Sequence, residues 1–198
     1  FSHLYAADLP LVGAIRWDAW SGGLATEQTA RSLGPSKYHD RLPWFAVPLE
    51  ENKVEIIGGK QEIMDKDIEY AVAAGLDYWA FLTYPENSDM SIDLKKYLSS
   101  SKRKQIKFCL ILHHFLGASE EDWPKELARV LSLMQEPDYL KVCGNRPLLY
   151  FFASLSSEFH GRWQSFLAST KDANLEPYCV YMGWAPRYDY NTYKKLGF

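Results

Sequence analysis

Residues 71–86, AVAAGLDYWAFLTYPE, contain the end of a helix, a stop signal, a buried strand and a polar loop. Upstream, apolar residues recur at the spacing of one helix face, which predicts a helix over residues 60–74. Gly75 ends that helix, as glycine commonly does just past a helix C-terminus. Residues 76–82 form a continuous apolar run, which is typical of a strand covered on both faces. The stretch therefore predicts one helix-to-strand unit of an α/β protein.

The same unit recurs along the chain, because short apolar runs alternate with longer amphipathic stretches. Successive strand-and-helix units imply right-handed crossovers and a parallel sheet. The predicted strands are residues 11–17, 76–82, 106–112, 147–152 and 177–182. The predicted helices are residues 60–74, 91–101, 119–134, 156–170 and 190–196.

The remaining segment near the N-terminus is predicted to be irregular. Residues 18–43 indicate a long loop, and residues 42–48 with 54–57 indicate a small hairpin that its prolines weaken. A doubly wound sheet would usually carry a G-x-G-x-x-G turn after its first strand, and Gly22-Gly23 does not match that pattern. We therefore predict a partial (β/α)8 barrel of the TIM type.

The length of the chain bears on how much of that barrel is present. A closed barrel takes eight units and about 250 residues. About five β/α units are recognisable in residues 1–198, which we predict to form a single domain. The remainder of the barrel is thus expected to be missing from this chain, with Gly197-Phe198 leading toward a sixth strand.

Composition limits the partners of the protein. The hydrophobic content of 47%, the charged content of 24% and the net charge of −3 are those of a soluble globular protein without a nucleic-acid partner. No apolar run reaches the roughly 18 residues of a membrane span. The start, Phe1 to Tyr5, resembles a mature or trimmed terminus. The three cysteines form no C-x-x-C pattern and are expected to be buried thiols in apolar surroundings, with Cys143 in a turn.

In a barrel of this type the loops after the strands form the active face. Aromatic, acidic and imidazole side chains gather in these loops, a mixture that suits a carbohydrate site better than a phosphate site. Asp18 and Glu86 are the candidate catalytic carboxylates, since glycoside cleavage needs a pair, although loop acids are usually solvated. The candidate substrate-binding residues are Trp17, Trp20, Tyr84, His113, His114, Trp184, Arg187 and Tyr188.

Neither a metal nor a cofactor is expected. His113 and His114 are adjacent and should point to opposite sides of the strand end, so that one faces the site and the other a helix. The chain contains no H-x-H or H-E-x-x-H pattern, no P-loop and no G-x-S-x-G elbow.

Four stretches in order resemble the glycoside hydrolase family 99-like proteins. They are residues 12–20, 73–81, 106–110 and 137–150, the last of which contains a Tyr-Leu … Asn-Arg-Pro entry into a strand. The resemblance implies a barrel fold like that of endo-α-mannosidases and polysaccharide-biosynthesis proteins. It also implies a glycan or polysaccharide partner, with mannose as a candidate sugar, and a secreted, periplasmic or secretory-pathway location.

The chain departs from the family in two respects. Family members often have an acid or amide after the second and third strands, where this chain has Leu82-Thr83 and His113-His114-Phe115. The hydrolases of the family place their catalytic acids in a late Glu-Trp-x-Glu-like segment, so the principal acids are expected beyond residue 198. Three functions stay open: a glycoside hydrolase, a non-catalytic glycan-binding or inactive barrel module, and a barrel enzyme acting on another substrate.

Overall fold

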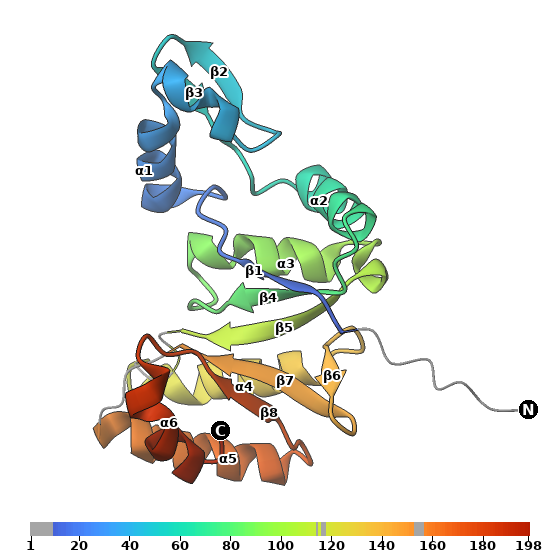
Figure 1. The fold of residues 1–198 in the computed structure, drawn as a ribbon, viewed down its shortest axis with the longest axis vertical. Helices are drawn as coiled ribbons and strands as arrows, with labels where there is room; N and C mark the ends of the chain where they lie inside the picture. Colours follow the sequence, from blue (N-terminus) through green and yellow to red (C-terminus); the bar gives the residue numbers. More distant parts are fainter. Residues whose placement is uncertain (1–9, 114, 116–117, 153–156) are drawn as a thin grey trace, which may run out of the picture.

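The central feature of the computed structural model is a mostly parallel sheet (Figure 1). The structure describes residues 10–113, 115, 118–152 and 157–198. Five strands lie side by side in chain order and pair in parallel, while a short sixth strand pairs antiparallel with the start of β7. The prediction of an α/β fold with a parallel sheet is confirmed. The strands are β1 (Gly13–Arg16), β4 (Tyr78–Leu82), β5 (Lys107–Leu112), β6 (Lys141–Val142), β7 (Arg146–Phe151) and β8 (Tyr178–Tyr181).

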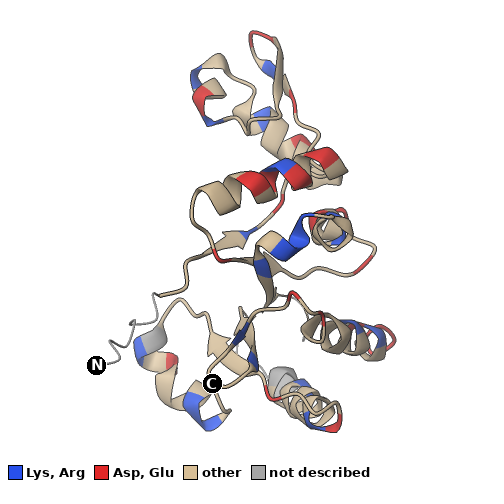
Figure 2. Ribbon diagram, turned by 90° about the vertical axis from the view of Figure 1, so that its right-hand side faces the viewer, with Lys and Arg blue, Asp and Glu red and all other residues tan. Residues whose placement is uncertain are grey.

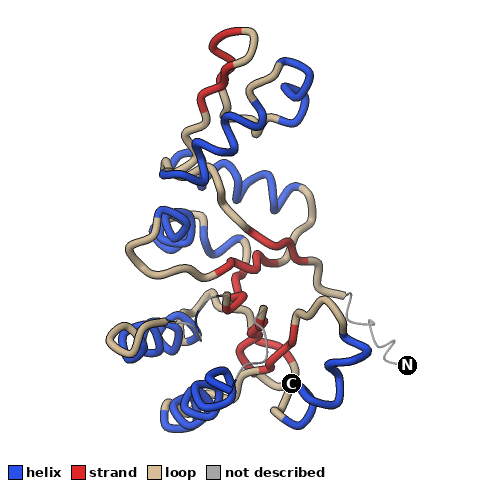
Figure 3. Tube along the Cα trace, turned by 90° about the vertical axis from the view of Figure 1, so that its left-hand side faces the viewer, coloured by secondary structure: helices blue, strands red, loops and turns tan. Residues whose placement is uncertain are grey.

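Helices follow the strands, as the alternation of the sequence predicts. Figures 1 and 3 show α3, α4 and α5 stacked along one side of the sheet. The α-helices are α1 (Gly23–Leu33), α2 (Gln61–Ala73), α3 (Ile92–Ser99), α4 (Trp123–Met134), α5 (Ser157–Asp172) and α6 (Pro186–Lys195). The 3-10 helices are η1 (Ser36–Arg41), η2 (Asp89–Ser91) and η3 (Arg103–Gln105).

The predicted stop at Gly75 is confirmed by the geometry of the helix end. Gly75 has φ +80°, and its N–H bonds to the carbonyl of Val72 while that of Leu76 bonds to Ala71. This pair of bonds satisfies the last carbonyls of α2 and turns the chain toward β4. Gly197 and Phe198 close α6 with the same two bonds.

The prediction of a long loop over residues 18–43 is wrong. That segment contains α1 and η1. No residue of α1 is buried, and Leu24 and Leu33 are its only large apolar side chains, so the segment lacks the dense apolar stripe of a core helix. A hairpin is present as predicted, but its first strand is β2 (Val47–Glu50) and not residues 42–48, and it pairs with β3 (Lys53–Glu55). Figure 1 shows it beyond β1 at one end of the molecule, next to α1.

The two faces of the sheet differ in what covers them. Toward the helices, Tyr97 of α3 contacts Phe81 and Phe108, and Trp163 of α5 contacts Phe151. These side chains are buried and form the main core. In Figure 2 the charged residues lie mostly on the helices and connecting segments, away from the strands. The sheet is thus held by apolar packing against one layer of helices.

The opposite face carries a shallow apolar hollow. The Tyr78 hydroxyl lies 3.1 Å from that of Tyr150, and the Tyr78 ring covers Gly13, where a Cβ atom would overlap it. Ile15 at this face is 58% exposed. The hollow is lined by Gly13, Ala14, Ile15, Tyr78, Ala80, Ile111, Tyr150 and Met182.

Candidate functional site

Five aromatic side chains lie next to one another where the five parallel strands end. Each comes from a different strand-to-helix connection. The Trp17 indole N–H donates to the Tyr84 hydroxyl at 2.7 Å. The ring centroids of consecutive residues then lie 5.9 Å (Tyr84 and His113), 5.3 Å (His113 and Phe152) and 5.6 Å (Phe152 and Trp184) apart. We call Trp17, Tyr84, His113, Phe152 and Trp184 the aromatic row.

The period of a β-strand explains why these residues meet. Alternate residues of a strand point to the same face. Each member of the row lies two residues after a residue on the face opposite the helices, for example His113 after Ile111 and Trp184 after Met182. Because the strands are parallel, their ends meet at one edge of the sheet. The row is therefore a continuation of that face beyond the last strand residues.

The row is exposed at its ends and half-buried at its centre. Trp17 is 58% exposed and Trp184 is 90% exposed, whereas Tyr84 and His113 have intermediate exposure. Two indoles thus flank a more sheltered middle. These aromatic surfaces are large and stiff, and they carry N–H and O–H groups at their edges. Such a surface suits ligands that have both apolar and polar faces.

A buried ion pair on α4 fixes the backbone beneath Tyr84. Arg129 donates to the Tyr84 carbonyl at 2.8 Å and to the Glu126 carboxylate at 2.6 and 3.0 Å. The other oxygen of Glu126 accepts the Glu86 backbone N–H at 3.4 Å. Ser91 also donates to the Tyr84 carbonyl, at 3.1 Å. The turn of residues 84–86 is thereby held against α4.

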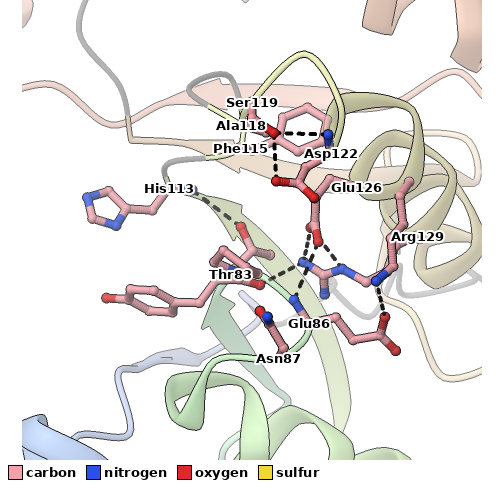
Figure 4. Close-up of a pocket in the computed structure, with 13 residues that line it drawn as sticks. Thr83, Glu86, Asn87, His113, Phe115, Ala118, Ser119, Asp122, Glu126 and Arg129 are labelled. Carbon is pink, nitrogen blue, oxygen red and sulfur yellow. Dashed lines mark hydrogen bonds and ion pairs between the residues drawn. The ribbon is translucent and has the colours of Figure 1, made fainter.

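Tyr84 and His113 also line a cavity of about 290 Å³ between the loop after β4 and the start of α4 (Figure 4). Figure 4 shows the His113 ring to one side, while Glu126 and Arg129 point toward each other from α4. The candidate Glu86 lines this cavity as well, and its carboxylate lies 3.5 Å from the Lys125 ammonium. The cavity contains both charged and apolar groups.

The predicted site residues separate into two groups. Trp17, Tyr84, His113 and Trp184 belong to the aromatic row. The others have different surroundings: Trp20 packs edge-on against Phe45, Arg187 and Tyr188 are exposed on α6, and His114 lies outside the described residues.

Asp18 and Glu86 are not brought together as a pair. Asp18 is buried and binds Arg16 through both carboxylate oxygens, with Nε distances of 2.9 and 3.2 Å. Glu86 is exposed and faces Lys125. An acid–base pair acting across a glycosidic bond needs two carboxylates facing each other, whereas each of these two carboxylates faces a cation.

Arg16 is the centre of a buried cluster of charges. Its guanidinium also binds Asp67 of α2 at 3.0 Å and lies 4.4 Å from the centroid of the Trp79 ring. Asp93 of α3 accepts a hydrogen bond from the Ser21 hydroxyl beside this cluster. Burial raises the pKa of Asp93 to about 7, and the charge of Asp18 raises it as well, against the Ser21 hydrogen bond and the charge of Arg16.

We expect the stability of the protein to fall as the pH rises. Asp93 has a pKa of about 7 when folded and an ordinary value of 3.8, so the folded chain keeps a proton that the unfolded chain releases. Its contribution is fully present below pH 3.8 and is lost as the pH rises through about 7. The unfolding free energy, measured in urea between pH 4.5 and 8, should therefore decrease by up to about 1.4 kcal/mol per pH unit.

Asp93→Asn should flatten this decrease, because an amide keeps the Ser21 hydrogen bond without titrating. Glu121→Gln, an exposed change in the turn before α4, is the control and should leave the slope unchanged. An equal slope in Asp93→Asn and the parent chain would contradict the role of Asp93.

Some functional groups could not be found from the sequence. Phe152 was included in the predicted fourth strand but not in the site, although it lies two residues after Tyr150 and so continues the same face. Glu126 and Arg129 give no such signal, because charged residues three apart on a helix usually form a solvated face.

The described residues offer little for metal or thiol chemistry. They contain no group of three His, Cys, Asp or Glu side chains that could hold a metal ion. Burial raises the pKa of Cys109, and raises that of Cys179 to about 12, so neither thiol is activated. Cys143 is exposed in the turn before β7, so the expectation of a buried thiol is wrong for this residue. None of the described helices is both long enough and apolar enough to cross a bilayer.

Comparison of the chain with models of protein families, with curated proteins and with solved structures gives no match.

Proposed function

We propose that this chain forms part of a (β/α)8-type barrel, related to the glycoside hydrolase family 99-like proteins, and binds a glycan along the aromatic row. The observation that carries this function is the row itself: five aromatic rings from five successive connections at the carboxyl ends of parallel strands. This edge is where α/β barrels hold their ligands. The consecutive order of the strands supports a barrel over a doubly wound sheet, whose strand order reverses.

A glycan suits this surface physically. A pyranose ring presents apolar C–H faces that pack on aromatic rings, and hydroxyl groups that bond to the polar groups at their margins. The bases of a nucleic acid could also stack on such a row. The net charge of −3 disfavours nucleic-acid binding, however, because it repels the phosphate backbone.

Trp184→Ala tests this function most directly. The side chain is 90% exposed, so we expect its removal to leave the unfolding free energy within about 0.5 kcal/mol. Loss of one stacking surface should weaken glycan binding about 5- to 20-fold, as measured by calorimetry with mannose oligosaccharides. Trp17→Ala should act in the same direction.

Tyr190→Ala is the matched control, since Tyr190 is a 61% exposed aromatic residue of α6 outside the row. The affinity of the Tyr190→Ala chain for the glycan should equal that of the parent chain. If none of a panel of neutral and charged oligosaccharides binds the chain, a glycan-binding function is excluded.

Glycoside cleavage is the second candidate, favoured by the position of Glu86 on the cavity beside Tyr84. It predicts release of shorter sugars, detectable by chromatography, and loss of that release in Glu86→Gln. Binding without product would favour the non-catalytic function.

A further inference from the structure

The cavity beside Tyr84 and His113 has a size suited to one small ligand unit. Its volume of about 290 Å³ is at the lower end of the range for small-molecule pockets. Two members of the aromatic row form part of its wall, so a ligand on the row can place one unit or branch into it. Ser119, Asn87 and Thr83 add hydroxyl and amide groups to the lining.

The cations of the cavity already have partners. Arg129 is bound to Glu126, and the two side chains are only 16% and 10% exposed. Lys125 lies 3.5 Å from Glu86. The third carboxylate of the lining, Asp122, accepts a hydrogen bond from the Ser119 hydroxyl at 2.6 Å. With His113 counted as neutral, three carboxylates and two cations leave the described lining with one excess negative charge.

This balance determines what the cavity can accept. A carboxylated, sulfated or phosphorylated sugar would face the excess negative charge and would need to displace Glu86 or Glu126 from its cation. A neutral sugar unit offers hydroxyl donors, which match the acceptor oxygens of Glu86 and Asp122.

The wall is also fixed before a ligand arrives. Glu126 holds the Glu86 backbone N–H, and Arg129 holds the Tyr84 carbonyl. Less ordering is then required on binding, and the charges cannot easily rearrange around an anion.

We infer that the cavity takes a neutral, hydroxyl-rich unit of the glycan and excludes acidic sugar units, a specificity that rests on the glycan-binding function proposed above. The determinants are Asp122 and Glu86 as acceptors, with Lys125 and Arg129 neutralised by carboxylates.

The test compares two probes of equal length on the 198-residue chain: neutral mannose oligosaccharides and oligosaccharides of uronic acids. Calorimetry at low salt should give at least about tenfold tighter binding of the neutral probe. The difference should shrink in high salt, where surface charges are screened.

Asp122→Asn should raise the affinity for the uronic acid probe about three- to fivefold and lower that for the neutral probe about two- to fivefold, because the amide removes the charge and keeps only one acceptor oxygen. Glu121→Gln removes the neighbouring charge, which does not line the cavity, and should change neither affinity. Tighter or equal binding of the acidic probe by the parent chain would overturn the inference and leave glycan binding intact. If neither probe binds, both the inferred specificity and the proposed glycan-binding function are contradicted.

Discussion

Replacing Arg16 by methionine should lower the free energy of unfolding by about 3–5 kcal/mol, the cost of leaving a buried charge without its partner. The guanidinium serves both Asp18 and Asp67, and its side chain is 12% exposed. Methionine retains much of the packing on Trp79 but offers no charge. Two acidic side chains would then lie close together without a cation between them.

Urea unfolding at pH 7, followed by circular dichroism, measures this effect. Arg31→Met, at an exposed position of α1, is the control and should change the free energy by less than about 0.5 kcal/mol. Adding Asp18→Asn to Arg16→Met should recover part of the loss, because one unpaired charge is removed. A loss no larger than that of the control would show that the cluster contributes nothing to stability.

Arg129→Met should lower the free energy of unfolding by about 3 kcal/mol and also weaken glycan binding. Glu126 would remain buried without its cation, and the Tyr84 carbonyl would lose a donor at 2.8 Å. The turn that positions Tyr84 in the aromatic row should then move and weaken glycan binding. If Arg129 only stabilised the fold, glycan affinity would not change.

Lys125→Met, in the preceding helical turn, is the matched control because its pair with Glu86 is exposed, and its stability change should stay below about 1 kcal/mol. Arg129→Lys should be intermediate, since an ammonium keeps the charge but cannot bridge Glu126 and the carbonyl as the planar guanidinium does. Unchanged glycan affinity in an Arg129→Met chain that is still folded at the assay temperature would contradict the positioning role.

The sequence was most informative where burial is complete. Apart from the exposed Lys107, the runs at residues 106–112 and 147–152 are apolar and largely buried, and their prediction as strands is confirmed within one or two residues. The helix over residues 60–74 was equally clear, since four residues of α2 are buried and a glycine follows it.

Prediction failed where the usual signals are absent. Helix α1 has no buried residue, and β6 spans only Lys141–Val142. In the site, four rings of the aromatic row were predicted correctly as neighbours at the strand ends, because strand ends can be located from the sequence. The partner of Asp18, Arg16, could not be predicted from the sequence. A loop carboxylate can face either solvent or a buried arginine, and packing between distant segments decides which.

The aromatic row also has a consequence for engineering the chain. Each ring belongs to a separate connection, while the apolar packing that holds the sheet lies on its other side. The ring positions could therefore be randomised in a combinatorial library, while buried residues of the same connections, such as Asp18 and Phe115, are kept. Trp17 and Tyr84 are the exception, because their hydrogen bond makes them one unit that should be varied jointly.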